Sequence, residues 1–88
     1  MKIDYSRKFI KKLKKSNKKI RVAFYKKLNI FRSNIYDQRL ENHKLNGEIK
    51  NLRSINITGD WRALYIDLDD KIEWVEFVDL GTHSELYK

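Results

Sequence analysis

Five residues suited to proton transfer, hydrogen bonding or stacking lie at turns, strand ends or the C-terminal tail of this chain: His43, Asp60, Trp61, His83 and Tyr87. Functional residues tend to collect in such segments. Histidine can give or take a proton because its unperturbed pKa lies near neutrality. Each position also has a structural interpretation, since Asp60 follows Gly59 as turn residues do, and Trp61 or Tyr87 can close a hydrophobic core.

The same residue types match the needs of RNA cleavage without a metal ion. That reaction needs a base for the 2′-hydroxyl proton, an acid for the leaving 5′-oxygen, and a cation to stabilise the phosphorane. His43 and His83 can serve either proton-transfer role. Arg53 and Arg62 can hold a phosphate, or they can keep edge strands soluble. The residues alone leave the catalytic and the structural interpretations open.

The charge of the chain is divided unevenly between its two halves. Twenty Lys and Arg against twelve Asp and Glu give a net charge of +8, which suits a polyanionic partner such as nucleic acid. Residues 1–44 hold fifteen basic and three acidic side chains, a charge of +12, whereas residues 45–88 hold five and nine, a charge of −4. We therefore expect polyanions to be attracted to the first half.

Lysines are concentrated at positions 11, 12, 14, 15, 18 and 19. On a helix with a single apolar stripe, most of them point to water, which is the usual role of a charge run. The alternative is a surface that follows a phosphate backbone, with salt-sensitive binding and no sequence preference.

The length and composition predict one domain over residues 1–88. With 41% hydrophobic and 12% aromatic residues the chain can form a packed core. It has no cysteine and only two histidines, so we expect neither a metal site nor a cofactor. Because Asp4 lies close to the start and no apolar run approaches the roughly 20 residues of a membrane span, we expect a protein of the reducing cytoplasm, not of a membrane.

The first half predicts a short strand followed by two helices. Ile3 and Tyr5 alternate with charged neighbours, as in a strand. Ser6 is a candidate N-cap for a helix that ends near residues 16–17, and Asn17 can start a second helix. Along that second helix, apolar residues recur at steps of three and four: Ile20, Phe24, Leu28, Phe31 and Ile35.

The second half predicts strands at 49–57, 61–67 and 71–79, joined by the short turns 58–60 and 68–70. In the last strand, one face is expected to carry Ile72, Trp74, Val78 and Leu80 and the other Val75 and Phe77, so we expect burial on both faces. In the first strand, Leu52 is out of step with Ile55 and Ile57, which suggests a bulge or twist. The predicted fold class is α+β, with an N-terminal strand and two helices packed on an antiparallel sheet in the order β-α-α-β-β-β.

Four segments between residues 43 and 87 carry a resemblance to a known family. They read HKLNG at 43–47, NLR at 51–53, GDWRALY at 59–65 and LGTHSELY at 80–87. In this order and spacing, they resemble the RelE/ParE toxin superfamily, and within it the YafQ branch. The resemblance implies a RelE-like fold and the toxin of a type II toxin-antitoxin system, a ribosome-dependent endoribonuclease that cuts messenger RNA.

The resemblance also implies roles for individual residues. The catalytic set is expected to be His43, Asp60 and His83, with Tyr87 at a terminal aromatic position where a phenol adds a proton donor or acceptor. Which residue is the acid and which the base is left open. Substrate contacts are expected from the following residues: Lys44, Lys50, Arg53, Asn56, Trp61 and Arg62.

Asn56 is a departure from the YafQ pattern, which has a further histidine at this position. An amide cannot act as an acid or a base at neutral pH, although it can hydrogen-bond a phosphate or a base.

The family further implies a cognate antitoxin, whose acidic segment suits the basic first half. Two alternatives remain, a ParE-like toxin that binds gyrase without nuclease activity and a plain basic nucleic-acid-binding module.

Overall fold

A computed structural model describes residues 1–87 of the chain. Strand β1 (Lys2–Tyr5) leads into helices α1 (Arg7–Lys15) and α2 (Lys18–Ser33) and a short 3-10 helix η1 (Gln38–Leu40). The remaining elements are the strands β2 (His43–Lys44), β3 (Leu52–Thr58), β4 (Trp61–Asp67) and β5 (Trp74–Thr82), and the final helix α3 (His83–Leu86). The α+β class and the strand-helix-helix-strand order are confirmed.

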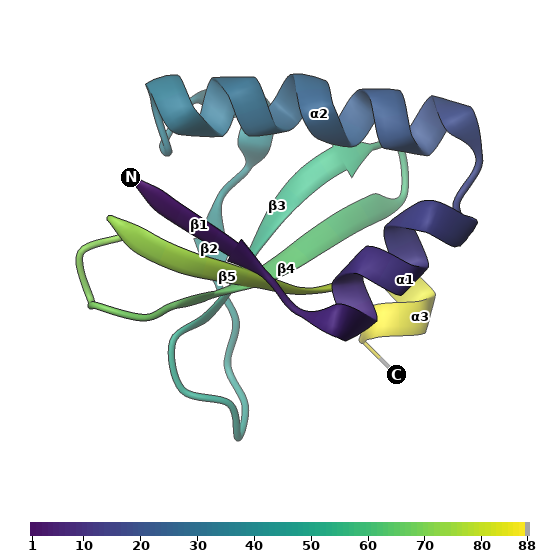
Figure 1. The fold of residues 1–88 in the computed structure, drawn as a ribbon. Coiled ribbons are helices and arrows are strands. Elements are labelled where there is room, and N and C mark those ends of the chain that lie inside the picture. The colour runs from purple at the N-terminus through teal and green to yellow at the C-terminus, as the bar shows by residue number, and fades with distance from the viewer. Residues whose placement is uncertain (88) are drawn as a thin grey trace.

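The strands form one five-stranded sheet in the order β1-β5-β4-β3-β2, with α2 lying along one of its faces (Figure 1). Strands β2 to β5 pair antiparallel, as expected. Strand β1 pairs parallel to β5, so the sheet is mixed. A parallel partner is possible here because the long stretch between β1 and β5 provides the crossover that parallel pairing needs.

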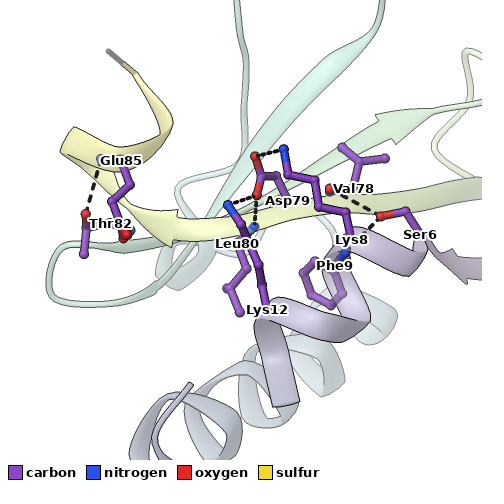
Figure 2. Close-up of polar contacts among 9 residues, drawn as sticks. All are labelled: Ser6, Lys8, Phe9, Lys12, Val78, Asp79, Leu80, Thr82 and Glu85. Atoms are coloured by element: carbon purple, nitrogen blue, oxygen red, sulfur yellow. Dashed lines mark hydrogen bonds and ion pairs between the residues drawn. The ribbon is translucent and has the colours of Figure 1, made fainter. Parts of the chain in front are cut away.

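The predicted helix starts are confirmed by their capping contacts. The Ser6 Oγ accepts a hydrogen bond from the Phe9 N–H at 3.0 Å, and the Asn17 Oδ1 accepts one from the Ile20 N–H at 3.0 Å. The Ser6 hydroxyl also donates to the Val78 carbonyl at 3.3 Å, which ties the start of α1 to β5 (Figure 2). One serine therefore caps the helix and positions it against the sheet.

The predicted apolar stripe of α2 faces the sheet and is buried at Ile20, Phe24, Leu28 and Phe31. Ile35 lies beyond the helix and packs, partly buried, against the core. At the centre of this core Phe77 of β5 contacts five aromatic rings at centroid distances of 5.4–6.0 Å: those of Tyr5, Phe9, Phe24, Phe31 and Tyr65. The core therefore joins β1, both long helices and the sheet.

Two predicted strand starts are too early. Residues 49–51 belong to the turn before β3, and residues 71–73 belong to the loop before β5. The second loop is held by carboxylates, because Asp67 accepts the Ile72 N–H and Asp69 accepts the N–H groups of Lys71 and Glu73. Ile72 has a φ of 53°, outside the extended region, so the strand cannot extend back through it.

The prediction that β5 is buried on both faces is wrong, because the strand contains a bulge. Leu64 pairs with Asp79 and the next residue, Tyr65, pairs with Phe77, so Val78 is an extra residue. Leu80 therefore faces the core together with Phe77, while Trp74 is 41% exposed. The irregularity expected in β3 is also present, as a register shift between residues 56 and 58.

Within residues 1–87, no helix combines the length and apolar character needed to cross a membrane.

We predict that Phe77→Ala lowers the free energy of unfolding by about 3–5 kcal/mol, because a buried ring that contacts five others is removed. Urea denaturation measures the change. Tyr36→Ala is the control, since Tyr36 is 64% exposed, and its effect should stay below about 0.5 kcal/mol. A similarly small loss at Phe77 would contradict the central role of this ring.

Candidate active site

The face of the sheet away from α2, which we call the open face, carries polar side chains in the middle of β3 and β4. Strand alternation places Ser54 and Asn56 of β3 on it, and their partners in β4 are Leu64 and Arg62. On the other side of β3, His43 of β2 pairs with Ser54. The open face thus brings one of the predicted histidines beside Ser54, which is not among the predicted site residues.

The C-terminal segment covers this serine. The Tyr87 hydroxyl donates to the Ser54 Oγ at 3.0 Å, and Ser54 has no exposed surface. The rings of His83 and Tyr87 meet edge to face with centroids 4.5 Å apart. His43 and Tyr87, from distant parts of the chain, therefore both neighbour Ser54, and His83 joins them through its contact with Tyr87. A lone serine in a strand gives no sequence signal that could have revealed its contacts with the C-terminal segment and its place beside His43.

The ring of His43 has a defined tautomer when it is neutral. Its Nδ1 lies 2.8 Å from the carbonyl oxygen of Glu41, and a carbonyl can only accept, so Nδ1 carries the hydrogen. In the neutral ring, Nε2 then holds the free electron pair. Since His43 is exposed, this nitrogen is accessible to a substrate.

The residue before His43 is a hydrogen-bonding centre that holds the start of β2. The Asn42 Oδ1 accepts from the Arg53 Nε at 3.1 Å and from the Tyr65 hydroxyl at 2.9 Å, and its amide donates to the Ile35 carbonyl at 2.9 Å. Asn42 therefore links the segment after α2 to β3 and β4. His43 begins its strand from this anchored position.

Helix α3 turns directly out of β5 because of a reciprocal cap. The Glu85 N–H donates to the Thr82 Oγ1 at 3.3 Å, and the Thr82 N–H donates to the Glu85 Oε1 at 2.8 Å (Figure 2). A Cβ added at Gly81 would lie 3.2 Å from the Glu85 Oε1, so glycine suits this close return. The glycine and threonine of the GTH motif thus have a structural role, and they place His83 at the first position of the helix.

Asp60 lies in the exposed turn between β3 and β4 and is joined to His83 through the backbone. Its carbonyl accepts the His83 N–H at 2.9 Å. Beside this turn, the Arg62 Nη1 donates to the Asn56 Oδ1 at 2.9 Å and to the Gly59 carbonyl at 2.9 Å. The open face therefore carries a guanidinium that is oriented by Asn56.

Four of the predicted substrate contacts lie elsewhere. Trp61 packs against the core and, with Lys12 and Leu80, lines a hollow on the side of α1. Lys44 and Arg53 line another hollow of about 180 Å³, together with Asn51, Asp67 and Asp70. Lys50 is exposed in the turn before β3. Strand alternation puts Arg53 and Lys44 on the sheet face opposite to that of Ser54 and His43.

Among residues 1–87, no group of three or more His, Cys, Asp or Glu side chains is arranged to hold a metal ion.

Comparison with known proteins assigns the family. A family model described as the bacterial toxin of type II toxin-antitoxin systems, YafQ, matches residues 1–88. The chain belongs to the YafQ family of toxins. A comparison of this YafQ-family toxin with curated proteins gives no match.

Solved structures share its fold. It is similar to YafQ from E. coli strain BL21(DE3), with a TM-score of 0.78 and 22% identity over 98% of this chain and 97% of that chain. For the E. coli DinJ-YafQ complex the TM-score is 0.70, with 26% identity over 98% and 97%. For the intact E. coli RelBE toxin-antitoxin complex it is 0.69, with 21% identity over 92% and 94%.

An ion-pair cluster ties α1 of this YafQ-family toxin to the end of β5 that leads into α3. The Asp79 carboxylate lies 2.6 Å from the Lys12 Nζ and 3.1 Å from the Lys8 Nζ (Figure 2). Burial raises the pKa of Asp79, but the hydrogen bonds from Lys12, Lys8 and the Leu80 N–H, together with the charge of Lys12, lower it, and the net pKa lies below the usual value. Lys12, a member of the lysine run, is therefore engaged within the fold.

We predict that Asp79→Asn destabilises the protein at pH 7 by roughly 0.5–1 kcal/mol. Because the pKa of Asp79 is lower in the folded than in the unfolded chain, the carboxylate stabilises the fold above its ordinary pKa of about 4. This contribution is lost as the pH falls through the folded-state pKa. The difference between variant and wild type in urea denaturation should therefore shrink toward about pH 2.

The exposed loop residue Glu48 provides the control, and Glu48→Gln should match the wild type at both pH values. A penalty at Asp79 of the same size at low and neutral pH would contradict the stabilising role of its charge.

Proposed function

We propose that this YafQ-family toxin is an endoribonuclease that cuts messenger RNA on the ribosome. The observation that carries the proposal is that His43 and Tyr87 both neighbour Ser54 on the open face, and that His83 contacts Tyr87. Two imidazoles and a phenol supply the groups that exchange protons when RNA is cleaved. A toxin that acts by binding alone does not need this combination.

In the proposed reaction, His43 is the base. Its Nδ1–H is donated to the Glu41 carbonyl, so Nε2 takes the proton of the 2′-hydroxyl. The 2′-oxygen attacks the adjacent phosphorus, and the bond from phosphorus to the 5′-oxygen breaks. Protonated His83 gives its proton to this leaving oxygen. The products are a 2′,3′-cyclic phosphate and a 5′-hydroxyl, and the two proton transfers use no metal ion or cofactor.

Charge on the phosphorane is stabilised by Arg62, whose guanidinium is oriented by Asn56. Asp60 assists from the adjoining turn, because its backbone carbonyl accepts the His83 N–H at 2.9 Å and so fixes the residue that carries the acid. Asn56 and Arg62 are therefore the substrate contacts we retain.

We propose dependence on the ribosome because the exposed site offers little to orient the RNA for in-line attack. His43 and His83 are exposed. An outside scaffold that holds the messenger RNA in line for attack supplies the orientation that a deep pocket otherwise provides. Helix α1, whose Lys12 and Lys15 line a hollow with Glu85 of α3, presents a basic surface that suits a polyanion: Arg7, Lys8, Lys11, Lys12 and Lys15.

The proposed regulator is a cognate antitoxin in the cytoplasm. The similar structures of DinJ-YafQ and RelBE are toxin-antitoxin complexes. The charge of +12 on residues 1–44 favours an antitoxin segment that is acidic.

The test is a cell-free translation reaction in which mRNA ends are mapped by primer extension. Wild-type protein should produce cuts within translated codons, and purified mRNA without ribosomes should be cut far more slowly. His43→Ala and His83→Ala should each reduce cleavage by about a hundredfold or more, because each removes one proton-transfer group.

Tyr25→Ala is the matched control, since it removes an exposed ring from α2, and it should cleave like the wild type. Growth arrest with intact mRNA, or full toxicity of His83→Ala, would refute the nuclease. Gyrase binding with DNA damage under the same conditions would favour the ParE-like alternative.

A further inference from the structure

Ser54 is a polar residue in an unusual position. It has no exposed surface although it lies on the open face, opposite to the main hydrophobic core. Burying a hydroxyl is unfavourable unless it is hydrogen-bonded. Here the partner is the Tyr87 phenol at 3.0 Å, from a residue 33 positions along the chain. The hydroxyl of an inner strand is therefore satisfied by the C-terminal segment, through the half-buried Tyr87.

The two ends of the C-terminal segment are held in different ways. Its start is fixed by the cap between Thr82 and Glu85 and by the hydrogen bond from the His83 N–H to the Asp60 carbonyl. Helix α3 has only four residues, and the Tyr87 N–H closes its last turn on the His83 carbonyl at 3.0 Å. The bond between Tyr87 and Ser54 holds the far end of the segment to the sheet.

This contact also sets where the phenol lies relative to both histidines. Ser54 is the direct strand partner of His43, and the Tyr87 ring lies 4.5 Å from the ring of His83. A tyrosine on a short terminal helix would otherwise rotate about its side-chain bonds. Anchored on Ser54, its hydroxyl lies at the strand partner of His43, while its ring contacts that of His83.

We propose that Ser54 is a positioning residue for Tyr87, an inference that rests on the proposed nuclease function. Each hydroxyl can both donate and accept, so Ser54 can donate to the phenol oxygen while Tyr87 donates to a phosphate oxygen of the RNA. Ser54 itself does not touch the substrate. Its role is to hold the Tyr87 hydroxyl where the phosphorane forms, between the base and the acid.

The test compares single-turnover mRNA cleavage on saturating ribosomes by Ser54→Ala, Tyr87→Phe and the double variant. Each single change should slow cleavage about tenfold, the effect of one well-placed hydrogen bond. The double variant should be no slower than either single one, because both changes remove the same contact. Ser33→Ala is the matched control, since it removes an exposed serine hydroxyl on α2 and should leave the rate unchanged.

A second readout does not depend on activity. The NMR shifts of the His83 ring protons are sensitive to the neighbouring Tyr87 ring, so in Ser54→Ala they should move toward the values of Tyr87→Ala. If Ser54→Ala fails to fold, Tyr87→Phe tests the same hydrogen bond, because it removes the phenol hydroxyl and leaves Ser54 in place.

Wild-type rates in Ser54→Ala or Tyr87→Phe, losses that multiply in the double variant, or unchanged His83 shifts would each overturn the inference. If wild-type protein cuts no mRNA, the proposed function fails, and the His83 shifts still decide whether Ser54 positions Tyr87.

Discussion

The extra residue Val78 in β5 is the constraint on which the geometry of the open face depends. Phe77 and Leu80 both pack in the core, although three positions separate them and a regular strand would turn one of them outward. The bulge at Val78 allows both to face the core. It also makes Gly81 the partner of Arg62, so the chain leaves the sheet for α3 beside the polar residues of β3 and β4.

From that exit, the terminal segment has little freedom. Thr82 and Glu85 form the cap that starts α3, and His83 is bound to the turn of Asp60. Tyr87 then reaches the buried Ser54 one helical turn later. The aromatic core therefore acts on the site indirectly, because the position of Phe77 determines where β5 ends and where both His83 and Tyr87 lie.

The helices and the α+β class could be predicted because their signals are local. Ser6 and Asn17 cap their own helices, and the stripe of α2 is spaced within one element. The parallel pairing of β1 could not be predicted, because its partner β5 lies far along the chain. The face on which Leu80 is buried could not be predicted either, because it depends on a bulge without a composition signal. The sequence motifs identified His43, His83 and Tyr87 one by one. The position of Ser54 between β2 and the C-terminal segment appears only in the assembled fold, because it depends on residues far apart in the sequence.

The claim that RNA reacts on the open face can be tested by photo-crosslinking on the ribosome. An mRNA with 4-thiouridine in the codon being read, and a 2′-O-methyl group to block cleavage, would be irradiated with bound toxin and the crosslinked peptides identified by mass spectrometry. The account predicts crosslinks to the peptides that contain His43, Asn56 and Tyr87. Crosslinks confined to α2 on the opposite face would contradict it.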